Sequence, residues 1–162
     1  MQVGLSGNST GRSILHEDAG DMPKSPIRVA IVDDEAPVRN ALARLLSASS
    51  FEPRTYGSAR EFIDALRIDI PECLIVDVHM PDFTGLDLQR LLNRMDKKIP
   101  TVVITAFDDV GVRERSTASG AKVFLTKPLH GPTLIDAIFK VTGRAPPEVP
   151  RGRTMNSRKR KI

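Results

Sequence analysis

Four short apolar runs of this sequence each end at a polar residue that could take part in chemistry. The polar residues, with the run that each ends or follows, are Asp33 and Asp34 (27–32), Asp77 (73–76), Thr105 (101–105) and Lys127 (122–126). Hydrophobic periodicity alone does not require polar residues at these ends. The repeated pattern therefore suggests that the four runs contribute to one site.

Carboxylates that share one pocket need a cation among them. Two like charges about 4 Å apart repel by roughly 4 kcal/mol at an effective dielectric near 20, so Asp33, Asp34 and Asp77 could not converge alone. Their oxygens suit a divalent ion of the Mg²⁺ type, and Lys127 adds a second positive charge. A hard cation, a lysine and a hydroxyl such as that of Thr105, placed around one carboxylate, suit phosphoryl transfer.

Taken singly, the same residues also have ordinary interpretations. Asp34 could cap a helix that begins near Pro37, and Asp77 could be a loop acid. A lone lysine such as Lys127 is most often a solvated surface residue. Only the convergence of several strand ends favours a site over these alternatives.

The elements that would position these residues alternate along the chain. We expect strands at 27–32, 51–56, 73–76, 101–105 and 122–126, each followed by a segment with helical apolar spacing. Pro53 cannot donate a ladder hydrogen bond, so 51–56 is expected at an edge. Ser58 with Glu61, and Thr84 with Asp87, predict capping boxes that open two helices. The segment 109–119 is the poorest helix, because it contains glycine and several hydroxyl residues.

Five strands alternating with five helices predict an α/β fold with a doubly wound parallel sheet covered on both faces. In such sheets ligands bind beyond the carboxyl ends of the strands, where the strand order reverses. This edge is where the chain places its acidic residues, Thr105 and Lys127.

Composition bounds the class of protein. Hydrophobic residues make up 40% and charged residues 27%, as in ordinary globular proteins. No apolar run approaches the roughly 18–20 residues of a membrane span, and the N-terminus does not resemble a secretory signal. With the single Cys73 unable to form an internal disulfide, we expect a cytoplasmic location.

The chain is expected to hold one domain between two tails. Residues 1–26 lack periodicity and predict a disordered extension, 27–143 the domain, and 144–162 a disordered basic tail. The last segment carries seven lysines or arginines against one glutamate, so the net charge of +4 conceals a slightly acidic remainder. Nineteen residues are too few for a helix-turn-helix domain, which predicts either a stand-alone protein without a dedicated DNA-binding domain or a domain cut from a longer protein.

The chain resembles the receiver domain of two-component response regulators over roughly 27–143. The resemblance is carried by four motifs in the family's order and spacing: VDDE (32–35), IVDVHMPDFTG (75–85), ITA (104–106) and TKP (126–128). The segment TYGSAREFIDAL (55–66) is similar to receivers of the FixJ-like group. This resemblance implies a flavodoxin-like sheet of strand order 2-1-3-4-5.

The resemblance also implies a role for each site residue. Asp77 would accept the phosphoryl group, and Lys127 would pair with a phosphoryl oxygen. The peptide bond between Lys127 and Pro128 would be cis. Mg²⁺ would be bound by Asp77, Asp34, Asp33 through water, and the backbone carbonyl of His79. Thr105 and the aromatic Phe124 would act as the switch, although Phe124 could also be an ordinary core residue.

The implied partners are a histidine kinase or phosphotransfer protein and an unidentified downstream protein. Formation of a homodimer on phosphorylation is a further possibility. The run SRKRK (157–161) could touch nucleic acid by charge alone, but a solubilising tail is the simpler interpretation.

Two other functions fit part of the pattern. A haloacid-dehalogenase-type phosphatase also combines an aspartate nucleophile, Mg²⁺ and a lysine, but its nucleophile follows the first strand in a D-x-D arrangement, whereas Asp33 and Asp34 are adjacent. The other is a receiver-fold binding module that is never phosphorylated. It is disfavoured because all the site positions are filled.

Phe107 lies two residues after Thr105, at a position that in receivers influences access of the hydrolytic water. Because a phenyl ring cannot orient a water, the resemblance implies slow loss of the phosphoryl group. Phe107→Glu should shorten the acyl-phosphate half-life roughly tenfold or more. The decay of phosphorylated protein after removal of the donor measures this, with Phe107→Leu as the control. Equal half-lives for all three proteins would contradict the hypothesis.

Overall fold

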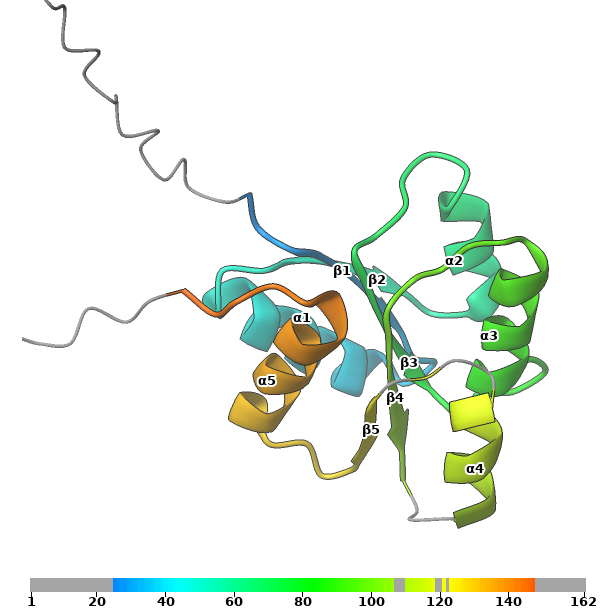
Figure 1. Cartoon of the computed structure of the whole chain (residues 1–162). Coiled ribbons are helices and arrows are strands. Elements are labelled where there is room, and N and C mark those ends of the chain that lie inside the picture. The colour runs from blue at the N-terminus through cyan, green and yellow to red at the C-terminus, as the bar shows by residue number, and fades with distance from the viewer. Residues whose placement is uncertain (1–24, 107–109, 119–120, 122, 148–162) are drawn as a thin grey trace, which may run out of the picture.

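The fold is described from a computed structural model that covers residues 25–106, 110–118, 121 and 123–147. Figure 1 shows a central sheet between two layers of helices. Our predictions for residues 1–24, for Phe107 and for 148–162 lie outside the described residues. None of the described helices is long and apolar enough to cross a membrane.

The sheet has the predicted parallel arrangement. Its strands are β1 (Arg28–Val32), β2 (Glu52–Tyr56), β3 (Cys73–Asp77), β4 (Thr101–Thr105) and β5 (Val123–Thr126). They pair in the order β2-β1-β3-β4-β5, all parallel, which confirms the order implied by the resemblance. The strand that contains Pro53 lies at an edge, as its missing backbone donor predicts.

Helices cover both faces of the sheet. They are α1 (Ala36–Ala48), α2 (Ala59–Ala65), α3 (Gly85–Arg94), α4 (Val110–Ala118) and α5 (Gly131–Thr142). Helices α1 and α5 lie on one face, and α2, α3 and α4 lie on the other (Figure 1). The predicted doubly wound α/β class is therefore confirmed, and the weak helix at 109–119 forms over a slightly shorter range.

Two apolar clusters fill the layers between sheet and helices. Ile31, Ile75 and Ile104 pack on the α1 and α5 side, whereas Val32, Val76 and Val103 pack on the other side. This alternation is the two-residue period of a strand. Because β3 is buried on both faces, the strand can be polar only at its end, where Asp77 lies.

The helix caps agree with the sequence in part. Thr84 and Asp87 form the predicted capping box, and the hydrogen bond from the Thr84 hydroxyl helps to hold the pKa of Asp87 below its ordinary value. The Ser58 hydroxyl accepts from the Glu61 amide as expected. The predicted capping box is wrong in its second hydrogen bond, because the Glu61 carboxylate accepts from the Gly57 amide, at 2.8 Å, and not from the Ser58 amide.

The first helix corrects one interpretation of Asp34. Its N-cap residue is Glu35, and no side chain caps this end. Asp34 is therefore not the cap that its position before Pro37 could have suggested.

Gly85 allows α3 to begin directly against the end of β3. A Cβ at this position would overlap the backbone carbonyl oxygen of Asp77 and lie 3.1 Å from Val76 Cγ2. The Gly85 amide donates to the carbonyl of Val78 at 3.3 Å, which holds the turn closed. A side chain here would push the loop after Asp77 away from the sheet.

Gly85→Ala should therefore lower the free energy of unfolding by about 1–3 kcal/mol, although alanine is the better helix former. Gly57→Ala is the matched control, because its Cβ would meet only side-chain atoms of Arg39 and Glu61, at 3.7 Å. That control should stay within about 0.5 kcal/mol of the natural protein in urea unfolding. Equal stabilities of the two variants would contradict the close approach.

Candidate functional site

The ammonium of Lys127 lies at the centre of three carboxylates. Its Nζ is 3.0 Å from Asp77 Oδ2, 3.3 Å from Asp33 Oδ2 and 3.4 Å from Glu35 Oε1. The Asp33 and Asp77 side chains are 2% and 3% exposed, whereas Glu35 is 60% exposed. Two buried acids thus share one partly buried base, and an exposed acid lies above them.

The sheet register places the two buried acids side by side. Val32 of β1 pairs with Val76 of β3, and the residue that follows each of them in the chain is an aspartate. Lys127 follows β5, two strands away from β3 in the sheet. Its amide donates to the carbonyl of Thr105, at 2.8 Å, and its peptide bond to Pro128 is cis, as expected. The long lysine side chain then crosses the end of β4 to reach Asp77.

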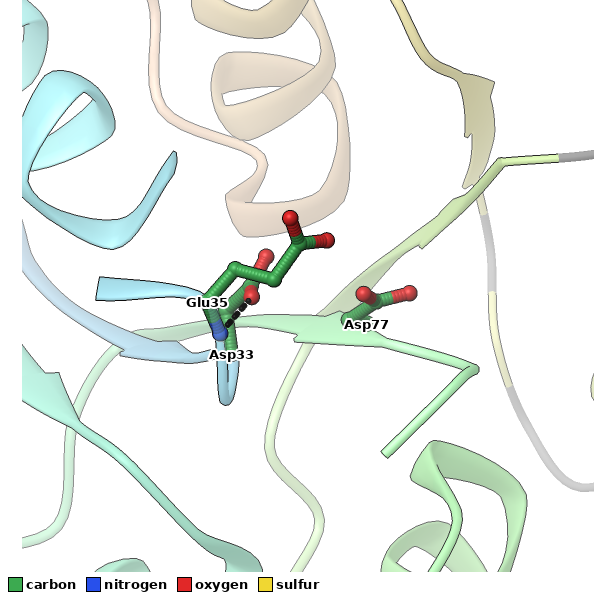
Figure 2. Close-up of side chains that lie close together, drawn as sticks. All are labelled: Asp33, Glu35 and Asp77. Atoms are coloured by element: carbon green, nitrogen blue, oxygen red, sulfur yellow. Dashed lines mark hydrogen bonds between the residues drawn. The ribbon is translucent and has the colours of Figure 1, made fainter. Parts of the chain in front are cut away.

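The three carboxylates lie close enough to share a metal ion. Figure 2 shows Asp33 and Asp77 at the ends of their strands, with Glu35 in the turn that follows β1. One oxygen of each residue lies within 4.8 Å of the others. The Glu35 amide donates to Asp33 Oδ1 at 2.8 Å, drawn as the dashed line in Figure 2, and this bond fixes the turn. An all-oxygen set of this size suits a hard divalent cation such as Mg²⁺.

Asp77 is held by a donor on each oxygen. The His79 amide donates to Oδ1 at 3.1 Å, and Lys127 donates to Oδ2 at 3.0 Å. The Val78 amide continues the pairing with β4 by donating to the Ile104 carbonyl at 2.9 Å. The carboxylate is therefore fixed in position at the carboxyl end of the central strand.

The charges in the pocket are not balanced. Burial raises the pKa of Asp33, and the charge of Asp77 adds to this, against the opposing effects of the Glu35 amide and Lys127. Burial lowers the pKa of Lys127, but the hydrogen bond and charge of Asp77, together with Asp33, raise it overall above its ordinary value. Negative charge thus exceeds positive charge here, and a further cation would relieve it.

Thr105 and His79 also lie close together at the carboxyl ends of the strands. Thr105 is buried, and its hydroxyl oxygen lies 3.4 Å from His79 Nε2. Phe124 of β5 pairs in register with Val103 of β4 and packs, partly buried, against the core on the α2, α3 and α4 side. Both predicted switch residues therefore lie on the two strands that lead into the site.

The structure brings together most of the predicted residues and adds one. Asp34 is exposed and stands outside the group formed by Asp33, Glu35 and Asp77. It lines a neighbouring hollow of 590 Å³ with residues of α2 and of the loop after β3, among them Met80. Glu35 was not predicted, although it is the last letter of the VDDE motif.

Comparison with known proteins places the chain in a family. Residues 29–139 match the family model described as the response regulator receiver domain. The chain is 38% identical, over 115 residues, to the transcriptional regulatory protein FixJ of Rhizobium meliloti, which covers 70% of this chain and 56% of FixJ. It spans about half the length of the curated relatives that it matches.

Solved structures agree in sequence and in fold. A response regulator receiver protein from Burkholderia phymatum is 40% identical, with a TM-score of 0.67, over 76% of this chain and 99% of that protein. The structure titled FixJ-N is 34% identical, with a TM-score of 0.69, over 74% of this chain and 95% of that one. The chain therefore belongs to the response regulator receiver domain family, the phosphoacceptor signalling domains of two-component systems.

Proposed function

We propose that this chain accepts a phosphoryl group on Asp77 from the phosphohistidine of a kinase or phosphotransfer protein. The observation that carries the proposal is the position of the Asp77 carboxylate, which is fixed by His79 and Lys127 beside a second buried acid. A carboxylate placed among oxygen ligands and a cation can act as a nucleophile toward phosphorus. The phosphorylated chain would then change its affinity for a downstream protein.

The transfer balances without any further reactant. An oxygen of Asp77 attacks phosphorus, a P–O bond forms, and the P–N bond to the donor histidine breaks. The imidazole leaves with its electron pair and takes up a proton. Lys127, already 3.0 Å from Oδ2, would pair with an oxygen of the transferred group and offset its charge.

The acidic pocket would hold Mg²⁺ through Asp77, Asp34, Asp33 by way of water, and the carbonyl of His79. The bound ion would neutralise phosphoryl oxygens and align the donor with Asp77. Asp33 and Asp77 already lie together, and Asp34 is adjacent in the chain. Glu35 is the alternative to Asp34, because its carboxylate lies in the same group.

Thr105 and Phe124 would transmit the change. The Thr105 hydroxyl would turn toward the new phosphoryl group, and Phe124 would move into the space that it leaves. The position of Thr105 at the end of β4 and that of Phe124 on β5 support this coupling. In this function the chain lies in the cytoplasm and catalyses only its own phosphorylation and dephosphorylation.

Incubation with acetyl phosphate and Mg²⁺ should raise the intact mass of the natural protein by one phosphoryl group. Asp77→Ala should show no gain, because the nucleophile is absent. Asp136→Ala, which removes an exposed aspartate of α5, is the matched control and should gain the same mass. A gain that persists in Asp77→Ala would contradict the proposal.

The metal ligands can be separated by two neighbouring substitutions. Mg²⁺ should raise the melting temperature of the natural protein, because an ion that binds only the folded state stabilises it. Asp34→Asn should abolish most of this rise, whereas Glu35→Gln should keep it. Thermal unfolding with and without Mg²⁺ measures both, and the reverse result would move the ligand role from Asp34 to Glu35.

A further inference from the structure

One arginine of α1 contacts the backbone of the turn that carries the acids. Arg39 is the fourth residue of the helix, and its side chain is partly buried. Its Nη1 donates a hydrogen bond to the backbone carbonyl of Asp33, at 2.6 Å. Hydrogen bonds from a charged donor are shorter and stronger than neutral ones. The guanidinium therefore holds the peptide unit that joins Asp33 to Asp34.

The other polar groups of Asp33 are engaged as well. Its amide donates to the Tyr56 carbonyl at 3.2 Å, Oδ1 accepts from the Glu35 amide at 2.8 Å, and Oδ2 accepts from Lys127 at 3.3 Å. The carbonyl is thus the one remaining point at which the turn is held. If this peptide unit rotated, the chain after it would turn too, and the next two acids would change direction. The bond from Arg39 prevents that rotation.

The same guanidinium packs against the turn after β2. A Cβ on Gly57 would lie 3.7 Å from both Nη1 and Nη2 of Arg39, and 3.7 Å from Glu61 Oε1. Gly57 and Asp34 line the same hollow of 590 Å³, so the turns after β1 and β2 are neighbours at this end of the sheet. Arg39 therefore ties the acidic turn to a second turn.

Helix stability does not account for a cation at this position. The N-terminal end of a helix carries partial positive charge, which favours anions over cations there. In α1 the first turn contains no acid, and Arg39 lies at the end of that turn. Its favourable partners are instead the Asp33 carbonyl and the carboxylates of the turn before the helix. The contact thus serves the acidic turn more than the helix.

We propose that Arg39 is a positioning residue that sets the affinity of the acidic pocket for Mg²⁺. The inference rests on the proposed function, because it takes the acids of the turn as ligands of the ion. Groups that hold metal ligands in place from outside typically contribute about 10–100-fold to metal affinity. The charge of Arg39 opposes a bound cation, but the side chain is only partly buried, so water and salt screen this repulsion. The positioning effect should therefore dominate.

The Mg²⁺ affinity of the folded chain tests the proposal without any phosphorylation. A ¹⁵N chemical-shift titration at constant ionic strength measures it. Arg39→Met keeps most of the side-chain length, removes the donors, and should weaken Mg²⁺ binding by about tenfold or more. Arg39→Lys keeps the charge and a donor and should recover most of this loss. Arg44→Met removes an exposed arginine of the same helix, and this matched control should change the affinity by less than about twofold.

The test is independent of the assignment of Asp77. At saturating Mg²⁺, Arg39→Met should still gain one phosphoryl group from acetyl phosphate, because the nucleophile and Lys127 are unchanged. The spectrum without Mg²⁺ shows whether each variant is folded. If Arg39→Met is not, Arg39→Gln, whose amide is too short to reach the turn, replaces it with the same expected loss. Equal affinities of the variants at positions 39 and 44, or tighter binding after loss of the guanidinium, would overturn the proposal.

Discussion

The structure depends on two buried carboxylates that share one ammonium group. Asp33 and Asp77 are almost fully buried, and burying a charge is costly unless it is paired. Lys127 offsets part of that cost, yet the pKa of Asp33 stays above its ordinary value because burial outweighs the pairing. The site therefore holds more negative charge than Lys127 offsets, and a bound divalent cation would offset the rest.

The parallel sheet makes this arrangement possible at all. Strands β1 and β3 are neighbours in register, so Asp33 and Asp77 emerge together, and β5 supplies the lysine from two strands away. The other residues of β3 and residues 29–32 of β1 are apolar and buried, which fixes the ends that carry the two aspartates. Gly85 then lets α3 start against the backbone of Asp77, so the loop after Asp77 stays close to the sheet.

Much of this could be predicted from the sequence, because the apolar runs and their polar ends are local patterns. The strand order came from the family motifs, and the Thr84 cap from its spacing to Asp87. Glu35 was missed because nothing in the sequence shows that the turn after β1 directs its carboxylate toward Lys127. The hydrogen bond from the Gly57 amide to the Glu61 carboxylate was missed for a similar reason, since spacing does not distinguish the two adjacent donors at positions 57 and 58.

The central claim is that Asp77 is the residue that carries the phosphoryl group, and the position of the acyl phosphate tests it most directly. Protein phosphorylated in the presence of Mg²⁺ can be reduced with borohydride, which converts an aspartyl phosphate to homoserine, and then mapped by tandem mass spectrometry. The account predicts homoserine at position 77 alone. Homoserine at position 33 or 34 instead, with Asp77 unchanged, would contradict it.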